Sequence, residues 1–293
     1  MNQLTDELVA KRDRLLALLA SYGSCAVAYS GGVDSAVVAK AAQLALGDVA
    51  IAVTGVSASL ADGELEQAAA LAAEIGIRHE RLDTDELVNP AYAVNAPDRC
   101  FHCKSELYSQ LAALAARLGV KEIASGTNLD DLGDYRPGLA AAAANGIRQP
   151  LAECGITKAD VRTLAAAWNL RVADKPASPC LSSRIAYGQA VTPERLRMID
   201  HAEQLVRSLG IAVCRVRYHA GDVARIEVPL DSVPILLEPK TNSMLHAEFA
   251  ILGFASMTVD SKGFRSGSLN ESLALHQIQV ERYAVLRKNI ASN

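Results

Sequence analysis

The sequence predicts an α/β protein in which a parallel sheet with flanking helices is followed by a smaller α+β domain. Short apolar runs alternate with Ala- and Leu-rich segments of helical length over the first 187 residues, the order expected of a parallel sheet with crossover helices. A paired-glycine turn joins the first apolar run directly to a helix-like segment. After about residue 187 the order of predicted strands and helices changes, so we expect domains at residues 1–187 and 188–293.

The first domain begins with an amphipathic segment, Met1–Tyr22, in which charged residues separate spaced leucines. This pattern indicates a surface helix and not a signal peptide. Helical spacing of apolar residues also marks Gly63–Gly76 and Lys104–Gly119, and the second of these ends at a glycine cap. The predicted strands are Cys25–Tyr29, Val49–Thr54, Arg78–Leu82 and Glu122–Ser125.

The second domain is predicted to open with a helix, because Thr192 and Pro193 form a typical helix start and the pattern continues to Gly210. We find no internal repeat of fixed period in the sequence. The mixture of later elements predicts a small α+β domain. These elements are a strand at Val213–Tyr218, a turn at Ala220–Asp222, a strand at Ala224–Val228, helical segments at Asp231–Leu237 and Ser243–Leu252, and a strand at Phe254–Val259.

Composition restricts the class of function. Hydrophobic residues make up 50% of the 293 residues and aromatic residues 4%, which favours helix-rich α/β packing over an all-β sandwich. A net charge of −4 argues against extensive contact with a nucleic-acid backbone, so no nucleic-acid partner is expected. No apolar run approaches membrane-spanning length, so no membrane partner is expected. Six cysteines without an export signal indicate reduced thiols and a cytoplasmic location.

A phosphate-binding loop is predicted at Ser30–Ser35, which has the sequence Ser-Gly-Gly-Val-Asp-Ser. Its glycines let the backbone approach an anion closely, and the helix start that follows presents N–H groups and the positive end of its dipole. The spacing is neither that of a Walker loop nor that of a dinucleotide-binding fold. Phosphate binding is therefore the first functional hypothesis.

Two thiols lie three residues apart, at Cys100 and Cys103, in a loop-like stretch that immediately precedes a helix. Pro90 and Pro97 come before them and favour a loop. This spacing alone is compatible with half of a zinc site, with a redox pair and with chance.

A third thiol, Cys180, lies in a proline-rich segment between Lys175 and Arg184. Nearby cations lower the pKa of a thiol from its usual value of about 8.5 and so increase the thiolate fraction. The thiolate is the form that attacks an electrophile or binds a metal. Cys180 is therefore expected to be functional and not a core residue.

Arg215 and Arg217 are two residues apart on a predicted strand and so share one face of it. On that face they could clamp a nucleotide phosphate, and a solvated strand face is the alternative. Glu203, on the preceding helix, is a weaker candidate for a substrate or metal contact. The six histidines form no metal-binding motif. The remaining cysteines, which are expected to be structural, are Cys25, Cys154 and Cys214.

Four stretches taken together resemble the LarE family of ATP-dependent sulfur transferases. That family acts on pyridinium-3,5-biscarboxylic acid mononucleotide during assembly of the nickel-pincer nucleotide cofactor. The stretches are the loop Ser30–Ser35, Ser125–Asp131, Tyr135–Gly138 and Pro179–Arg184. The loop itself resembles that of many PP-loop ATP pyrophosphatases, whereas the combination with the Pro-Cys-Leu segment resembles LarE. The resemblance covers most of the chain and implies a PP-loop domain followed by a C-terminal domain.

The resemblance implies a reaction in two steps. A substrate carboxylate attacks the α-phosphorus of ATP to give an acyl adenylate, while Mg²⁺ neutralises the departing pyrophosphate, and sulfur then displaces AMP. Asp34 would help to position the Mg²⁺ or the pyrophosphate. The implied ATP-binding residues are Ser30, Gly31, Gly32, Val33, Asp34, Ser35 and Gly126. The candidates for substrate binding are Arg215, Arg217, Glu203 and Arg184.

Members of the family differ in the source of the sulfur. Where the counterpart of Cys180 is a lone cysteine, that residue gives up its own sulfur and becomes dehydroalanine. Cys100, Cys103 and Cys180 match the three-cysteine members, in which three thiolates hold a [4Fe-4S] cluster and leave one iron free to carry sulfide from an external source. We favour the cluster, because the paired cysteines would otherwise lack a role. The resemblance also implies a homo-oligomer.

Two further functions fit parts of the sequence. A tRNA-thiolating PP-loop enzyme also couples adenylylation to sulfur held by a cysteine or a cluster, but the basic surface expected of it is not evident. A nucleotide-binding module without turnover would use Cys100 and Cys103 as structural zinc ligands.

Overall fold

The structure is a computed structural model that describes residues 4–133, 137–176 and 178–265. The chain forms two compact units. The first comprises Met1–Ala93 and Asp98–Cys180, and the second comprises Val94–Pro97 and Leu181–Asn293. The chain thus enters the second unit briefly before it returns to the first, a feature that the sequence pattern did not predict. The domain bounds 1–187 and 188–293 remain a prediction.

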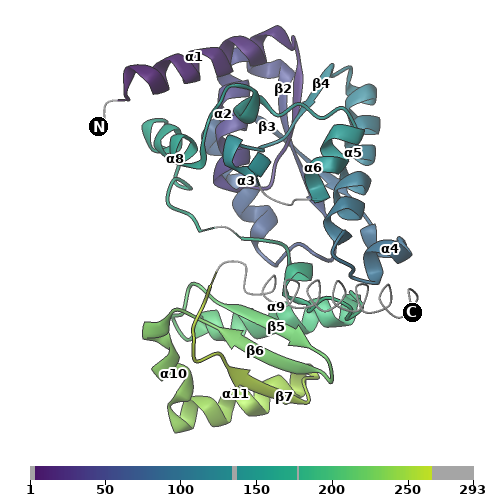
Figure 1. Ribbon diagram of the computed structural model, residues 1–293, viewed down its shortest axis with the longest axis vertical. Helices are drawn as coiled ribbons and strands as arrows, with labels where there is room; N and C mark the ends of the chain where they lie inside the picture. Colours follow the sequence, from purple (N-terminus) through teal and green to yellow (C-terminus); the bar gives the residue numbers. More distant parts are fainter. Residues whose placement is uncertain (1–3, 134–136, 177, 266–293) are drawn as a thin grey trace, which may run out of the picture. The chain divides into compact units, whose positions relative to one another are not determined.

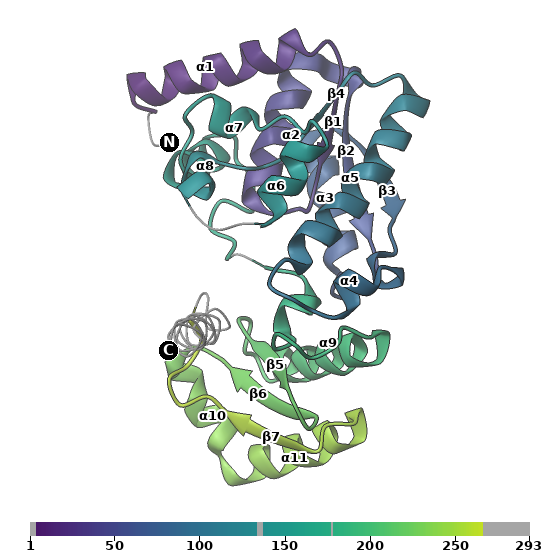
Figure 2. The same ribbon diagram turned by 45° about the vertical axis from the view of Figure 1, so that its right-hand side comes forward.

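The N-terminal unit is built on a four-stranded sheet in the order β3-β2-β1-β4 (Figures 1 and 2). Every neighbouring pair in this sheet is parallel, which confirms the predicted α/β class. β1 lies in the centre, so its carboxyl end is flanked by the ends of two other strands. The strands are β1 (Cys25–Ala28), β2 (Ala50–Val56), β3 (Arg78–Asp83) and β4 (Glu122–Ala124).

Helices cover both faces of this sheet (Figure 2). Cys25 and Val27 point into a core with the helices on one face, whereas Ala26 packs with Leu111 and Leu114 on the other, as expected from alternation along a strand. The first face is covered by α1 (Asp6–Ser21), α2 (Val33–Leu46), α3 (Glu64–Ile75) and α8 (Lys158–Ala167). The second is covered by α5 (Arg99–Leu118), against which α6 (Pro137–Ala144) packs.

Local sequence signals set the ends of these helices. The Thr157 side chain and Asp160 form a reciprocal capping box at the start of α8, and Gly119, in the left-handed conformation at φ 68°, ends α5. The short elements of this unit are η1 (Gly47–Val49), η2 (Glu86–Val88), α4 (Pro90–Ala93), η3 (Leu129–Gly133) and α7 (Pro150–Glu153).

The C-terminal unit holds a three-stranded sheet in the order β5-β6-β7, in which the first pair is antiparallel and the second parallel. Its apolar face includes the buried side chains of Val216, Tyr218 and Ile226. Phe254 packs beside Tyr218, and Phe249 packs against Phe254 in the same core. The elements are η4 (Leu181–Arg184), α9 (Pro193–Ser208), β5 (Arg215–His219), β6 (Val223–Glu227), η5 (Leu230–Ser232), α10 (Val233–Leu237), α11 (Pro239–Leu252) and β7 (Ser256–Val259).

One local prediction was wrong. Cys100 and Cys103 lie inside the first turns of α5, which begins at Arg99, and not in a loop before a helix. The prolines misled the sequence argument, because proline is tolerated at and just before the first turn of a helix; Pro90 itself begins α4. Of the stretch Tyr135–Gly138, residues 135 and 136 lie outside the described residues. Within the described ranges, no helix is both long enough and apolar enough to cross a membrane.

Candidate active site

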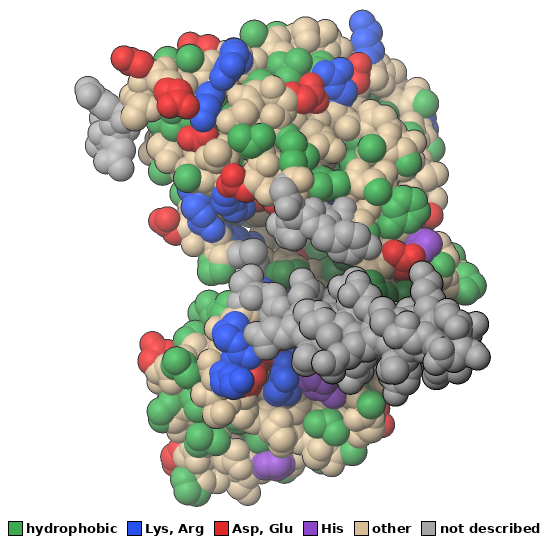
Figure 3. Space-filling view, in the orientation of Figure 1, with side chains coloured by type: hydrophobic (Ala, Val, Ile, Leu, Met, Phe, Trp, Pro, Cys, Tyr) green, Lys and Arg blue, Asp and Glu red, His purple; other side chains and the backbone are tan. Residues whose placement is uncertain are grey.

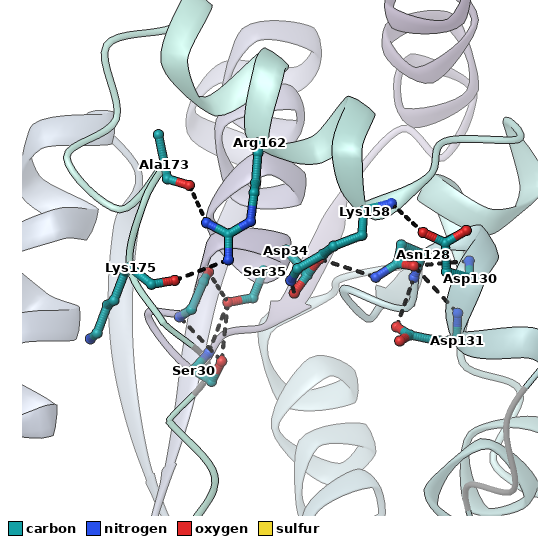
Figure 4. Close-up of polar contacts among 11 residues, drawn as sticks. Ser30, Asp34, Ser35, Asn128, Asp130, Asp131, Lys158, Arg162, Ala173 and Lys175 are labelled. Atoms are coloured by element: carbon teal, nitrogen blue, oxygen red, sulfur yellow. Dashed lines mark hydrogen bonds and ion pairs between the residues drawn. The ribbon is translucent and has the colours of Figure 1, made fainter. Parts of the chain in front are cut away.

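The Ser30–Ser35 loop connects the end of β1 to the start of α2 and is held by its own serine side chains (Figure 4). The Ser35 hydroxyl accepts from the Ser30 backbone N–H at 3.2 Å and lies 3.2 Å from the Ser30 hydroxyl. Gly31 has φ 69°, and a Cβ there would lie 3.1 Å from the Cβ of Ala68. Both the backbone conformation and the close packing therefore require glycine at this position.

Gly126 lies directly behind the first turn of α2. A Cβ at Gly126 would stand 2.7 Å from the backbone nitrogen of Ser35 and 3.0 Å from the carbonyl carbon of Asp34. A side chain at this position would displace the start of α2. Because Gly126 has no side chain, the segment after β4 can pack directly against the phosphate-binding loop.

The Gly126→Ala variant is therefore expected to displace the start of α2 and to weaken ATP binding by at least about tenfold, the loss typical of a strained or overpacked site. Equilibrium binding of a non-hydrolysable ATP analogue measures this. Gly146→Ala is the control for packing, because no atom lies within 4 Å of a Cβ built there, although its φ of 64° adds a backbone strain that Gly126 does not have. Equal affinities for the two variants would show that packing against the loop is not required.

Asp34 anchors a polar network at the carboxyl edge of the sheet (Figure 4). Its carboxylate accepts from the Asn128 side-chain amide at 3.2 Å and forms an ion pair with the ammonium group of Lys158. The Asn128 backbone N–H donates to Asp131 at 3.1 Å, and the Lys158 backbone N–H donates to Asp130 at 2.8 Å. The first turn of α8 and the segment after β4 thereby meet the loop at one carboxylate.

A cavity of about 320 Å³ opens above this loop. This volume lies within the range of roughly 300–1,000 Å³ that is typical of small-molecule sites. The charged side chains on its wall are Asp34, Asp131 and Lys104, and the remainder is largely small residues and backbone. Hydroxyl groups of Ser30, Ser35, Ser125 and Thr127 supply further polar contacts.

A second cavity, of about 170 Å³, adjoins the first and shares Ala28, Ser30 and Lys104 with it. Cys103 and Cys180 both line this second cavity. Two of the predicted thiols therefore lie beside the phosphate-binding loop, although Cys103 lies in α5, between β3 and β4, and Cys180 is more than 70 residues further along the chain.

Cys100, the remaining predicted thiol, also interacts electrostatically with Lys104. Burial lowers the pKa of Lys104, and interactions with Tyr108, Cys103, Cys180 and Cys100 raise it by more. Burial, followed by the neighbouring Cys180, raises the pKa of Cys103 to about 12. Lys104 is thus a cation close to all three thiols, and bringing negative thiolates together here requires a positive partner such as a metal.

The cations that flank Cys180 in sequence have other partners. The Lys175 ammonium group donates to Gln67 at 3.3 Å, and the guanidinium of Arg184 is buried against Glu203 in the C-terminal unit. Among the described residues, no three His, Cys, Asp or Glu side chains are placed to hold a single metal ion. Cys100, Cys103 and Cys180 therefore lie near the same lysine but are not arranged around a single metal position.

The other predicted binding residues gather in the C-terminal unit, in a buried network of charges. Glu203 is fully buried and accepts from Arg184 at 2.9 Å and from Arg207 at 2.7 Å. Glu227 is also fully buried and accepts from Arg217 at 3.0 Å. Arg217 and Arg215 are 2% and 7% exposed, so the strand face that could have been solvated is buried.

Among the described residues of this network, arginines outnumber carboxylates. It links six arginines to three carboxylates: Arg184, Arg207, Arg215, Arg217, Arg225 and Arg265 with Glu203, Glu227 and Asp260. Burial, and then the charges of Arg217 and Arg184, lower the pKa of Arg215 to about 10. Buried charges of this kind are costly unless they are paired and hydrogen-bonded, so the ion pairs with Glu203 and Glu227 are needed to hold these arginines in place.

The Glu203→Ala variant is expected to lower the free energy of unfolding by about 3–5 kcal/mol, because it leaves two arginines and the Val216 backbone N–H without their shared acceptor. Urea denaturation followed by circular dichroism measures the loss. Glu194→Ala, an exposed change on the same helix, should shift the transition little. A Glu203→Ala transition that coincides with that of the control would contradict the account of this network.

Sequence inspection missed four residues of the first cavity and its network, namely Lys104, Asn128, Asp131 and Lys158. Asn128 and Asp131 lie in Ser125–Asp131, one of the stretches on which the family resemblance depends. The resemblance therefore marked these residues but did not assign a role to either. Lys104 directly follows Cys103, and its position one residue beyond a metal-ligand motif was the available cue. Nothing in the sequence around Lys158 pointed to Asp34, which lies 124 residues earlier.

Comparison with known proteins adds independent information. The NAD synthase family model matches residues 15–110. An uncharacterized protein of Synechocystis sp. is 44% identical over 91% of this chain and 99% of its own length. The pyridinium-3,5-bisthiocarboxylic acid mononucleotide synthase of Lactiplantibacillus plantarum is 37% identical over 92% of this chain and 98% of its own length. A tRNA-specific 2-thiouridylase of Xanthobacter autotrophicus is 33% identical, but over only 58% of this chain and 54% of its own.

Proposed function

Because this chain belongs to the LarE family and is an ATP-dependent PP-loop sulfurtransferase, we propose that it acts on pyridinium-3,5-biscarboxylic acid mononucleotide. It adenylylates a carboxylate of that substrate and replaces AMP with sulfur, giving a thiocarboxylate for the nickel-pincer nucleotide cofactor. The observation that carries the proposal is the adjoining pair of cavities, one above the phosphate-binding loop and one lined by thiols, with Ser30 and Lys104 in the wall of both.

The first cavity supplies the groups that adenylylation needs. Backbone N–H groups at the start of α2, with the dipole of that helix, bind the phosphates that leave as pyrophosphate. The carboxylates of Asp34 and Asp131 are the oxygen ligands that Mg²⁺ prefers, so the wall of this cavity fits the magnesium of Mg-ATP. Lys158, which pairs with Asp34, can turn to the pyrophosphate once Mg²⁺ binds that carboxylate. Gly126 keeps this side of the loop close to β4.

The carboxylate of the substrate is a poor electrophile until AMP is attached to it. Lys104 lines both cavities, so its ammonium group can orient the reacting carboxylate of the substrate and stabilise the charge that develops when sulfur adds to the adenylate. The thiols of Cys103 and Cys180 lie within the electrostatic environment of the same cation. Adenylylation and sulfur transfer therefore share one positive charge.

Cys100, Cys103 and Cys180 would hold a [4Fe-4S] cluster. The chemistry of the donors fits, because three thiols lie around one lysine beside the reaction cavity. When bound, such a cluster supplies an iron with no protein ligand, to which an external sulfide can attach.

The arginines of the C-terminal unit supply the contact for the substrate's own phosphate. Arg215 and Arg217 present two guanidinium groups on one strand face, and Arg184 adds a third to the same network. Glu203 holds Arg184 in place through two hydrogen bonds. We therefore assign Glu203 a positioning role instead of the direct substrate contact that the sequence suggested. We further propose that the protein works in the cytoplasm as a homo-oligomer, with sulfide supplied by a separate donor.

Anaerobic reconstitution with iron and sulfide tests the cluster directly. We expect about four irons and four sulfides per chain with broad visible absorbance, and loss of both in the Cys103→Ser variant. Cys154→Ala, which removes a buried thiol in the same unit, is the matched control and should reconstitute normally. A protein that takes up one zinc and no iron would contradict the proposal and support a structural zinc site. A protein that takes up no metal but loses sulfur from Cys180 during turnover would support the sacrificial route.

The similarity to a tRNA 2-thiouridylase raises a second candidate, thiolation of tRNA. Similarity over only 54% of that enzyme leaves its remaining part without a counterpart here. Incubation with ATP, sulfide and either tRNA or the pyridinium mononucleotide distinguishes the two: we expect AMP release that depends on the mononucleotide and not on tRNA.

A further inference from the structure

A buried carboxylate lines the second cavity, the one whose wall also includes two of the thiols. Glu86 begins η2, shortly after β3, and Ser57 directly follows β2, so both lie at the carboxyl edge of the sheet. Glu86 is only 3% exposed, and both residues line the cavity. An acidic group therefore lies buried in the wall of a cavity beside the phosphate-binding loop.

Neutral hydroxyl groups are the hydrogen-bond donors to this carboxylate. The Ser57 hydroxyl donates to Oε1 of Glu86 at 2.7 Å, and the Thr84 hydroxyl donates to Oε2 at 3.4 Å. Glu86 forms no ion pair with the residues that the structure describes. On the face that Figure 3 shows, by contrast, acidic side chains of the N-terminal unit lie beside Lys and Arg side chains. Because a buried charge is costly unless it is paired, Glu86 is suited to a cation that a ligand brings.

The wall of this cavity carries charges of opposite sign. Of its described lining residues, Glu86 is the acidic side chain and Lys104 the basic one. Leu60 and Leu107 add apolar surface. A planar ring that has a positive charge within it and a carboxylate at its edge matches this wall in both polarity and charge.

The volume of the cavity limits what it can hold. At about 170 Å³ it is smaller than the roughly 300–1,000 Å³ that is typical of a whole small-molecule site. It therefore fits one part of a larger ligand, such as a single aromatic ring. Cys103 and Cys180 in the same wall place that part of the ligand beside the thiols.

We propose that Glu86 is the counter-ion of the substrate's pyridinium ring and so determines which aromatic acids the enzyme accepts. Its carboxylate faces the ring nitrogen, whose positive charge is permanent, while Lys104 binds the carboxylate that reacts. This inference rests on the proposed function, because it takes the substrate to be a pyridinium carboxylate. A neutral aromatic acid of the same shape leaves the charge of Glu86 buried without a cation, so it binds more weakly.

The test compares two ligands that differ only in the charge of the ring. They are pyridinium-3,5-biscarboxylic acid mononucleotide and its C-nucleotide isostere, in which a benzene carbon replaces the ring nitrogen. Calorimetry measures their binding to the full-length protein in the presence of a non-hydrolysable ATP analogue. We expect the wild type to bind the pyridinium compound at least about tenfold more tightly, because a close and desolvated charge pair contributes that much or more.

Variants of Glu86 separate its charge from its shape. Glu86→Gln removes the charge but keeps an acceptor for the Ser57 hydroxyl. It should bind the pyridinium compound about tenfold more weakly and the isostere unchanged, so that the preference disappears. Glu86→Asp keeps a charge in the cavity and should retain a clear preference for the pyridinium compound. Glu66→Gln, on the exposed surface of α3, is the matched control and should keep the full preference.

The outcomes separate the role of Glu86 from the proposed function. Equal binding of the two ligands by the wild type, a preference that survives in Glu86→Gln, or no preference in Glu86→Asp would overturn this role. Equal weakening of both ligands in Glu86→Gln would also overturn it, because a purely structural residue affects both alike. Weaker binding of the ATP analogue by Glu86→Gln would show that the cavity holds the adenine ring instead. Failure of the wild type to bind either ligand would contradict the proposed function itself.

Discussion

Replacing Asp34 with asparagine is expected to slow ATP–pyrophosphate exchange by about 100- to 1,000-fold, the usual loss when one preorganised charge is removed from an active site. The carboxylate lines the cavity above the loop and pairs with Lys158, so its negative charge is available to bind Mg²⁺. An amide of the same shape keeps the contact with Asn128 but binds the metal poorly. The exchange assay, run with saturating substrate, reports adenylylation alone.

Asp48→Asn is the matched control, because Asp48 is exposed and lies in the short helix after α2, away from the cavity. Its exchange rate should equal that of the wild type. Thermal unfolding should be similar for both variants, since Asp34 is only partly buried. An exchange rate of the Asp34→Asn variant within a few-fold of the wild-type rate would show that Asp34 is not needed for adenylylation.

Replacing Cys103 or Cys180 with serine is expected to separate the two halves of the reaction. Both thiols line the second cavity and neither lines the first. The variants should therefore keep ATP–pyrophosphate exchange near the wild-type rate and lose formation of the thiocarboxylate by at least about 100-fold, because serine is a poor ligand for iron and carries no sulfur. Exchange assays and mass spectrometry of the product, on the same protein samples, measure the two halves.

The pattern across the three cysteines identifies the sulfur route. A cluster requires all of them, so Cys100→Ser, Cys103→Ser and Cys180→Ser should fail alike while Cys154→Ala produces thiocarboxylate normally. If only Cys180→Ser fails, Cys180 itself donates the sulfur. Loss of exchange in the cysteine variants would show that the two cavities do not act separately.

Much of the N-terminal fold followed from the sequence because its signals are local. The four strands, the glycine that ends α5 and the capped start of α9 each depend on a few neighbouring residues, and each lies within a few positions of its prediction. The same holds for the loop, where Gly31 adopts a φ of 69° that few residues other than glycine adopt.

What could not be predicted depends on residues that are distant in the sequence. Lys158 meets Asp34 because α8 packs against α2, and no local pattern encodes that pairing. The cation near Cys180 is likewise Lys104 and not the neighbours Lys175 or Arg184, since the side chains of those neighbours are directed to Gln67 and Glu203. Adjacency in sequence was a poor guide to electrostatics, because a pKa depends on distance in space and on burial.

The C-terminal arginines illustrate a partial success. Their shared face followed from the alternation of a strand, whereas their burial and the two carboxylates that hold them did not.

The account is tested most directly by one measurement on the anaerobically reconstituted protein, incubated with ATP, Mg²⁺, sulfide and pyridinium-3,5-biscarboxylic acid mononucleotide. Mass spectrometry of the small molecules and of the intact chain then follows both reactants. The account predicts a thiocarboxylate product, one AMP for each sulfur transferred, and an intact mass that shows Cys180 unchanged. AMP formation without a thiolated product, or conversion of Cys180 to dehydroalanine in step with product, would contradict it.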